Sequence, residues 1–441
     1  MVIGVKIMIK LKNNALIHSN LDEHKAILYD TYSAKKYYIP FNIAVEAQNN
    51  NLSSTDVLRI NNLLVDDAIP VVSEVQEKRI QHLRLIVTNK CNFKCSYCFA
   101  EGGSYGMYLD SMDEITAEKV IDFFFDKFSY INQVSFFGGE PLLEINIISC
   151  VCEYIHSLYE NKKILILPKF SMVTNGYLLD EKVVEIINKY HISLVVSHDG
   201  PPDIHNSLRK ARSNKGTFSH IDKCMLEFRR KNRVSIESTY TSIHEQNSIS
   251  RDQLSEYLSN RYSTDRVEIN DVQIEDEKLS YLRPISKITM SEKMHNFFLG
   301  EEKLYNDFLI RLLTTYLSGK YSKEFCSSGV REYCVDMHGD IYPCHRFEGK
   351  PEYKLGNVYN NEPIRRPKIK TKDDLKCSVC KYKMFCQVCV YSLSLDEEYC
   401  NDLKSCIDYF LHNMLDLLIT NKEEYNRIIE GYVEYGRKNR I

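Results

Sequence analysis

Residues 83–100, LRLIVTNKCNFKCSYCFA, join a short apolar run to three closely spaced cysteines. The run 83–87 is rich in aliphatic residues and too short for a helix, so it predicts a buried strand. Cys91, Cys95 and Cys98 follow on a loop in a CxxxCxxC pattern. Three thiolates on one loop bind a four-iron cluster with one iron left open to an external chelate. For this motif taken alone, a three-cysteine zinc site is the alternative.

Further apolar runs alternate with helical patterns as far as about residue 275. Such alternation is typical of parallel βαβ units. Six strands predict an α/β fold, an open, partial (β/α)6 barrel that lacks two strands of the closed form. The expected strands are 83–87, 134–137, 170–173, 192–196, 234–240 and 266–274, with helices among them over 116–128, 147–158 and 181–189.

Short polar motifs come directly after three of the later strands. In a parallel barrel the carboxyl ends of the strands share one rim, where these folds place their active sites. Glycines let a ligand approach the backbone closely, and carboxylate, amide and hydroxyl groups supply polar partners. The motifs contain Gly138, Gly139 and Glu140, then Asn175, and finally Ser197 and Asp199.

The composition excludes several classes of protein. The 441 residues include 15 cysteines, and 57 basic against 60 acidic side chains leave a net charge of −3, so no basic surface for nucleic acid is expected. No run approaches the ~18 apolar residues of a membrane span, and no targeting segment is evident. We therefore expect a cytoplasmic protein without a membrane partner, in which clustered cysteines are metal ligands and not disulfides.

Residues 1–80 form a separate pattern, in which strands are followed by helices. This order predicts a small winged-helix-like module, with an ordinary N-terminal extension as the alternative. A role in reading DNA is disfavoured because the second helix is not basic. The expected strands are 5–11, 25–29 and 36–39, and the expected helices are 42–48 and a second one that opens at Ser53 or Ser54 and runs through Leu64.

From about residue 320 to 406, cysteines and turn residues dominate, and a polar helical tail is expected over 407–435. Two CxxC-like pairs alone suggest a zinc ribbon, but only five residues separate Cys380 from Cys386, fewer than a ribbon needs. There are enough thiols for two more four-cysteine clusters. The cysteines of this region are Cys326, Cys334, Cys344, Cys377, Cys380, Cys386, Cys389, Cys400 and Cys406, whereas Cys150, Cys152 and Cys224 lie on helical patterns and are expected in the core.

Together, the cysteine loop and the rim motifs resemble those of the radical S-adenosylmethionine (SAM) enzymes. The resemblance implies a 4Fe–4S cluster on Cys91, Cys95 and Cys98, whose open iron chelates SAM. It further implies contacts to SAM from the rim. The implied SAM-binding residues are Tyr97, Gly138, Gly139, Glu140, Asn175, Ser197, Asp199 and Arg209, of which Arg209 departs from the family pattern because His205-Asn206 replaces the usual His-Asp before it.

The C-terminal cysteines resemble the SPASM extension of radical SAM peptide-modifying enzymes, which implies two auxiliary 4Fe–4S clusters. By this resemblance, Cys326, Cys344 and Cys389 hold the first cluster, and Cys334 either completes it or is a buried strand residue. The second cluster falls to Cys377, Cys380, Cys386 and Cys400, with Cys406 as the alternative to Cys400. The implied domains are a leader-recognition module (1–80), the partial barrel (81–318), a SPASM domain (319–410) and a helical tail (411–441).

Within that family, the residue after the YPC cysteine separates two activities. Sulfatase maturases, which make formylglycine, typically have an aspartate there, whereas thioether-forming peptide maturases commonly have the histidine found here, His345. The resemblance therefore implies a thioether crosslink in a precursor peptide with a leader, and a reductant such as flavodoxin or ferredoxin. Catalytic side chains are not identifiable, because the radical forms on SAM. A carbon–carbon crosslink, formylglycine formation and a non-catalytic zinc-ribbon protein are the alternatives.

Overall fold

The computed structural model describes residues 10–66, 78–274, 276–285, 290–300, 307–319, 322–360, 362–372, 374, 377, 379–391 and 397–439. The chain divides into two compact units. The first comprises Met1–Val72, Ile288–Cys326 and Ile369–Ile441, and the second comprises Ser73–Lys287 and Ser327–Lys368. The sequence predicted four consecutive domains, whereas these units interleave segments, and the predicted span 319–410 contributes to both.

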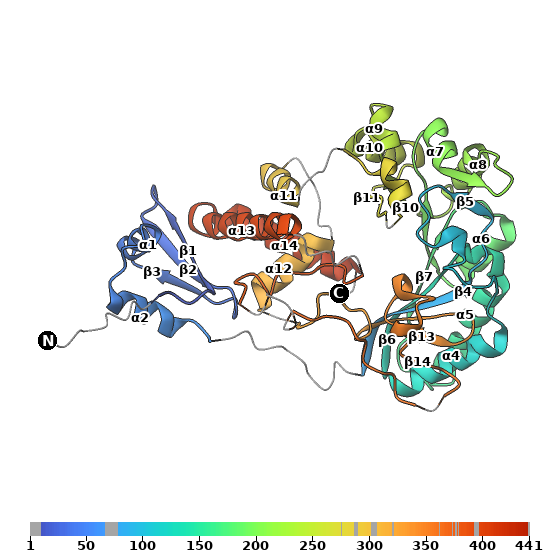
Figure 1. The fold of residues 1–441 in the computed structure, drawn as a ribbon, viewed down its shortest axis with the longest axis horizontal. Coiled ribbons are helices and arrows are strands. Elements are labelled where there is room, and N and C mark those ends of the chain that lie inside the picture. Colours follow the sequence, from blue (N-terminus) through green and yellow to red (C-terminus); the bar gives the residue numbers. More distant parts are fainter. Residues whose placement is uncertain are drawn as a thin grey trace. The chain divides into compact units, whose positions relative to one another are not determined.

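The second unit is built on one nine-stranded sheet in the order β11-β10-β8-β7-β6-β4-β12-β13-β14. The first six of these strands are parallel, which confirms the open, six-stranded α/β barrel. Helices α4, α5 and α6 lie along one side of the sheet (Figure 1). The six strands are β4 (Arg79–Thr88), β6 (Tyr130–Gly138), β7 (Lys169–Thr174), β8 (Ser193–Ser197), β10 (Ser235–Tyr240) and β11 (Val267–Asp271).

Buried aliphatic residues in the strands and polar caps on the helices explain why this alternation forms. Leu83, Leu85, Ile86 and Val87 of β4 are fully buried, as expected for a parallel strand covered on both faces. Side-chain caps accept hydrogen bonds from backbone N–H groups in the first turn of a helix, which have no partner within the helix. Asp113, for example, accepts from Thr116 N at the start of α4. The helices of this unit are α4 (Glu114–Lys127), α5 (Ile145–Glu160), α6 (Glu181–Lys189), α7 (Pro202–Leu208), α8 (Phe218–Phe228), α9 (Ser242–Gln246) and α10 (Arg251–Tyr262).

Three short strands from beyond the predicted barrel extend the same sheet. Strand β12 (Glu332–Val335) pairs in parallel with β4, and β13 (Asp340–Tyr342) and β14 (Gly356–Asn357) follow as antiparallel neighbours. The register sets Cys334 opposite Arg84 of β4. The YPC segment that follows β13 is therefore part of the unit that contains the barrel, which the sequence did not predict.

The first unit begins with a three-stranded antiparallel sheet, β1 (Ala15–Asn20), β2 (Lys25–Asp30) and β3 (Lys36–Ile39). Two helices follow, α1 (Phe41–Gln48) and α2 (Ser54–Leu63), and the Ser53 side chain caps the second. Two strands and both helices match the sequence prediction. Strand β1 was missed, and of the strand predicted over 5–11 only Lys10 and Leu11 lie within the described residues, where neither is in a strand.

The C-terminal residues of this unit are helical, as predicted, but the prediction of a polar tail was wrong because one face is buried. They form α13 (Glu397–Thr420) and α14 (Lys422–Asn439), next to α11 (Met290–Leu299) and α12 (Asp307–Ser318). Phe410, Leu411 and Met414 of α13 are fully buried in a core shared with Ile27 and Tyr29 of β2. A buried face at helical spacing is hidden in this sequence by the charged residues of the opposite face.

We predict that Gly138→Ala destabilises the second unit by at least about 2 kcal/mol. Gly138 has φ +140°, and an added Cβ would lie 1.9 Å from the carbonyl oxygen of Thr88. Gly356→Ala, in the same sheet, is the control, because its Cβ would meet nothing nearer than 4.0 Å. Denaturant unfolding of both variants measures the effect, and equal free energies of unfolding for the two would contradict the steric argument.

Candidate functional site at the strand ends

A pair of short strands holds the cysteine loop. Strand β5 (Phe93–Cys95) pairs with β9 (Arg209–Ala211), and this register sets Cys95 opposite Arg209. Arg212, at the end of β9, donates to the carbonyl oxygens of Cys91 (2.6 Å) and Gly102 (3.2 Å). The loop is thus bound at both ends by one guanidinium, a residue that the sequence did not single out because its role depends on chain segments over a hundred residues apart.

The three thiols lie close enough to influence one another. Burial raises the pKa of Cys91 to about 12 and of Cys95 to about 11, and the neighbouring thiols contribute in the same direction. Backbone N–H groups of Phe93 and Gly102 donate to the sulfurs of Cys91 (3.4 Å) and Cys98 (3.3 Å). Such N–H···S bonds stabilise thiolates, and a bound metal displaces the remaining protons.

Gly138 and Gly139 let two strand ends meet backbone to backbone. A Cβ at Gly139 would lie 2.3 Å from the carbonyl oxygen of Lys90. Gly139 N donates to Thr88 O (2.9 Å), and Glu140 N donates to Lys90 O (2.8 Å). The predicted glycine motif therefore lies directly against the residues that lead into the cysteine loop.

Glu140 is buried, and protein donors already bind most of its carboxylate. One oxygen accepts from Thr174 Oγ1 (2.6 Å) and Leu142 N (3.0 Å), and the other accepts from Asn175 N (2.7 Å). Burial raises its pKa, and these hydrogen bonds oppose the rise. Because each carboxylate oxygen accepts about two hydrogen bonds, one acceptor position remains, on the oxygen bound to Asn175.

Asn175 ties the end of β7 to the cysteine loop. Its Nδ2 donates to the side-chain oxygen of Asn92 (2.7 Å), and its own side-chain oxygen accepts from Tyr177 N (3.0 Å). Asn92 lies between the first two cysteines of the loop. Asn175 is thus in contact with the loop, but in the described residues both ends of its amide have protein partners.

Tyr97, Asp199 and Arg209 form a hydrogen-bonded chain. The Tyr97 hydroxyl donates to Asp199 (2.5 Å) and accepts from Arg209 Nη1 (2.6 Å). Asp199 also accepts from Thr239 N (3.1 Å), and the Arg209 cation opposes the rise that burial causes in the pKa of Cys95. Arg209 therefore lies beside the loop despite the altered motif before it, while Ser197 is half-buried at the end of β8.

The thiol groups do not converge as ligands of a single ion do. Within the ranges that the structure describes, no three His, Cys, Asp or Glu side chains are placed to hold one metal ion. In a four-iron cluster each cysteine binds a different iron, so the cysteine sulfurs are not required to meet at one point. The three-cysteine loop, with N–H donors on its sulfurs, fits such a cluster.

Comparison with known proteins decides the family of this site. Residues 85–258, which contain the cysteine loop and the rim motifs, match the model of the Radical SAM superfamily. The chain carries a radical SAM domain. Members of this superfamily use SAM with a 4Fe–4S cluster and are enzymes.

Similar proteins extend the likeness beyond the radical SAM domain. An uncharacterized protein of Methanocaldococcus jannaschii is 29% identical over 293 residues, which cover 66% of this chain and 94% of that protein. A cysteine-type anaerobic sulfatase-maturating enzyme of Clostridium perfringens is 25% identical over 338 residues, covering 67% of this chain and 85% of the enzyme. The solved structure of native anSMEcpe with bound AdoMet and Cp18Cys peptide has the same fold, with a TM-score of 0.57 at 21% identity over 77% of this chain and 99% of that one.

Four cysteines outside the radical SAM domain influence one another in the first unit. Burial raises the pKa of Cys386 to about 12. The thiols of Cys377, Cys380 and Cys400 raise it further, and the Lys372 cation opposes them. Cys406 behaves differently, because its sulfur donates to the carbonyl of Met290 (3.3 Å) from the buried face of α13. The structure therefore groups Cys400, and not Cys406, with the other three.

The remaining auxiliary ligands stay a prediction. Cys326 and Cys389 belong to the first unit and Cys344 to the second. Cys334 is fully buried within β12, and burial raises its pKa well above the usual value. Cys344 begins the 3-10 turn η4 (His345–Phe347), and burial raises its pKa to about 11.

A half-buried polar cluster follows Cys344. His345 Nδ1 lies 2.5 Å from Arg84 Nη1, and the same Arg84 nitrogen donates to Glu332 (2.9 Å). The His345 ring lies 4.9 Å from that of Phe137, the residue before Gly138. Burial and the neighbouring arginines hold the pKa of His345 well below its usual value. His345 is thus adjacent to the glycine motif of the radical SAM domain, which its position in the sequence alone does not predict.

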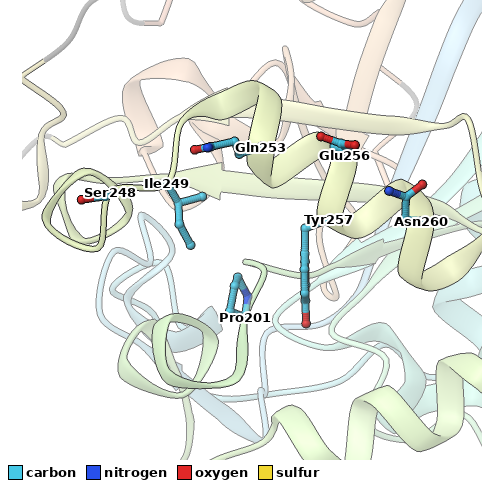
Figure 2. A pocket seen from close by; sticks show the side chains of 7 residues that line it. All are labelled: Pro201, Ser248, Ile249, Gln253, Glu256, Tyr257 and Asn260. Atoms are coloured by element: carbon cyan, nitrogen blue, oxygen red, sulfur yellow. The ribbon is translucent and has the colours of Figure 1, made fainter.

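A pocket of about 360 Å³ lies elsewhere on the radical SAM domain. Pro201, Ile249 and residues of α10 line it (Figure 2), and none of the predicted site residues does. We assign no role to it. No helix in the described part of the chain is both long and apolar enough to cross a bilayer.

We predict that Cys400→Ala lowers the iron content by about four atoms per chain, whereas Cys406→Ala leaves it unchanged. The two residues lie on the same helix, so each controls for general damage to α13. Iron and sulfide analysis of anaerobically reconstituted protein measures the difference. Loss of iron in Cys406→Ala with full iron in Cys400→Ala would contradict the grouping of thiols described above.

Proposed function

We propose that the chain is a radical SAM maturase that forms a cysteine thioether crosslink in a ribosomally made precursor peptide. One observation supports the radical chemistry most strongly. The cysteine loop, Glu140 and the Tyr97–Asp199–Arg209 chain lie together at the carboxyl ends of parallel strands. A protein of this kind supplies binding, orientation and exclusion of water, and the cofactor supplies the difficult bond cleavage.

The rim residues have distinct proposed roles. Cys91, Cys95 and Cys98 would hold the cluster that supplies one electron for SAM cleavage. The remaining acceptor position of Glu140 suits an N–H of the amino group of SAM, close to the backbone of Gly138 and Gly139. Ser197 and Asp199 are proposed to contact the ribose, and Tyr97 the adenine through its backbone. Arg209 would offset the negative charge of the thiolate-bound cluster beside Cys95.

Asn175 is proposed to act on SAM mainly through the loop. Both ends of its amide already have protein partners, so it would fix the position of Asn92 between two cluster ligands. Such a supporting role orients the groups that bind the cofactor directly.

The thioether crosslink is supported by the residue at position 345. Histidine occupies the position where formylglycine-forming enzymes typically have an aspartate, and His345 is held by Arg84 next to Phe137. Crosslinking removes one hydrogen atom from a carbon, one proton from a thiol and one electron. The auxiliary cysteines would hold two further clusters, which are suited to accept that electron or to lower the pKa of the substrate thiol.

Formylglycine formation is the second candidate, and one observation favours it. A relative whose match covers 67% of this chain is a cysteine-type anaerobic sulfatase-maturating enzyme. Against it stands the residue after Cys344, which is His345 here and not the aspartate typical of formylglycine-forming enzymes. Both candidates act on a cysteine in a peptide or protein, so the substrate class is the same.

The N-terminal sheet offers an edge for a leader peptide. Strand β3 pairs with β2 on one side and lies at the edge of the sheet, and Tyr38 on β3 is 69% exposed. An extended peptide adds to such an edge through backbone hydrogen bonds, with exposed side chains supplying specificity. The module is therefore proposed to bind the leader, and a flavodoxin or ferredoxin is proposed as the reductant.

The test is mass spectrometry of a cysteine-containing peptide encoded beside the gene for this chain, after anaerobic incubation with the enzyme, SAM and reductant. A thioether predicts the loss of two hydrogens and of one alkylatable thiol. Incubation without SAM is the control. An aldehyde at the cysteine would establish the formylglycine alternative, and loss of two hydrogens with all thiols retained would indicate a carbon–carbon crosslink.

A further inference from the structure

Two buried side chains beside the cysteine loop have polar atoms without partners. Glu348 is 2% exposed, and neither carboxyl oxygen has a hydrogen-bond partner in the described part of the chain. The hydroxyl of Tyr105 is buried and equally without a partner there. Buried polar atoms without partners are rare in native proteins, since each loses its hydrogen bonds to water, so a bound group is the expected explanation.

These two side chains come from adjacent loops. Gly349 follows Glu348 with φ +73°, and a Cβ on it would lie 2.8 Å from the carbonyl oxygen of Tyr105. Glu348 also acts electrostatically on the Tyr105 hydroxyl, whose pKa burial raises well above the usual value. The carboxyl and the hydroxyl therefore belong to one buried polar region.

This region adjoins the cluster-binding loop. The ring of Tyr105 meets that of Phe99, the residue after Cys98, edge to face at 6.0 Å, and Arg346 lies 4.6 Å over the same Phe99 ring. Cys98 is among the groups that act electrostatically on Tyr105. A group bound between Glu348 and Tyr105 would thus lie next to the site of radical formation.

The backbone of Tyr105 is strained. Its φ is +51°, in the left-handed region that bulky residues rarely adopt. Strain of this kind persists where the surroundings fix it, and it concentrates at ligand-binding positions. A tyrosine is thus held in an unfavourable conformation that buries a hydroxyl without a partner in the described chain, which points to a role in binding.

We propose that Glu348 and Tyr105 bind an amide group of the substrate peptide beside the cysteine loop. A neutral carboxyl group matches a primary amide, the end group of an Asn or Gln side chain, at two points. Its O–H donates to the amide carbonyl while its C=O accepts the amide N–H on the same side, an arrangement that the trans backbone amide does not offer. The Tyr105 hydroxyl adds a third hydrogen bond. Burial and Asp336 hold the pKa of Glu348 well above its usual value, which favours the neutral carboxyl. This inference rests on the proposed peptide substrate.

The first test needs no peptide. If Glu348 has no partner in the free enzyme, Glu348→Met is at least as stable as the wild type in thermal unfolding, because it removes a buried polar group. Glu352→Met, at an exposed position in the next turn, is the control. A clearly lower unfolding midpoint for Glu348→Met alone would mean that the carboxyl has a structural partner, and would overturn the proposal.

The second test measures peptide recognition. With the precursor peptide that the wild type crosslinks as substrate, Glu348→Met and Tyr105→Phe should each raise KM about tenfold or more. Glu348→Gln, which keeps one donor and one acceptor end, should raise KM less than about threefold. Uncoupled 5′-deoxyadenosine formation without peptide should be unchanged. Unchanged KM in Glu348→Met would mean that the region holds only water.

If the proposed function is wrong, the wild-type enzyme leaves the peptide unmodified, and this result does not depend on any Glu348 or Tyr105 variant. Acetamide, a small primary amide, then replaces the peptide as the probe. A carboxyl C=O stretch present in the wild type and absent in Glu348→Gln should shift in the infrared spectrum when the probe binds. A band that does not move at any probe concentration would overturn the assignment of an amide to this region.

Discussion

The backbone of residues 138–140 lies directly against that of residues 88–90, and the rest of the site depends on this contact. Two hydrogen bonds join the segments, and neither glycine has room for a Cβ. One segment leads into the cysteine loop and the other into Glu140 and the helices behind it. A side chain at Gly138 or Gly139 would separate the thiols from the Glu140 carboxylate, and both are proposed to act on the same small molecule.

Around that contact, hydrogen-bond donors and charges are arranged in advance. The carboxylates of Glu140 and Asp199 are buried, and protein N–H and O–H groups bind both. Arg209 and Arg212 place two guanidinium groups against one short loop. Preorganised dipoles of this kind require no rearrangement when a charged cofactor binds. Glu348 differs because its carboxyl has no such partners among the residues that the structure describes, and this contrast is the basis of its proposed role in binding substrate.

Local patterns predicted the barrel and the rim, because strand length, apolar content and the residues after each strand are local properties. The six parallel strands and the radical SAM domain are therefore confirmed. The same patterns failed where contacts with residues distant in the sequence determine the secondary structure or the role of a side chain. Strand β1 has only one fully buried side chain, Leu16, and α13 hides its apolar face among charged residues, so neither has a strong periodic signal. The roles of Arg212 and Glu348 depend on contacts between distant segments and were not predictable from either pattern.

The central claim is that the Cys91–Cys95–Cys98 loop cleaves SAM, and one anaerobic measurement tests it most directly. The reconstituted wild-type protein is incubated with SAM and dithionite without any peptide, and 5′-deoxyadenosine is quantified. Cys95→Ala, which loses one ligand of the loop and keeps every auxiliary cysteine, is the comparison. The structure predicts 5′-deoxyadenosine from the wild type and none from Cys95→Ala. Equal amounts from both proteins, or none from a wild type with full iron content, would contradict it.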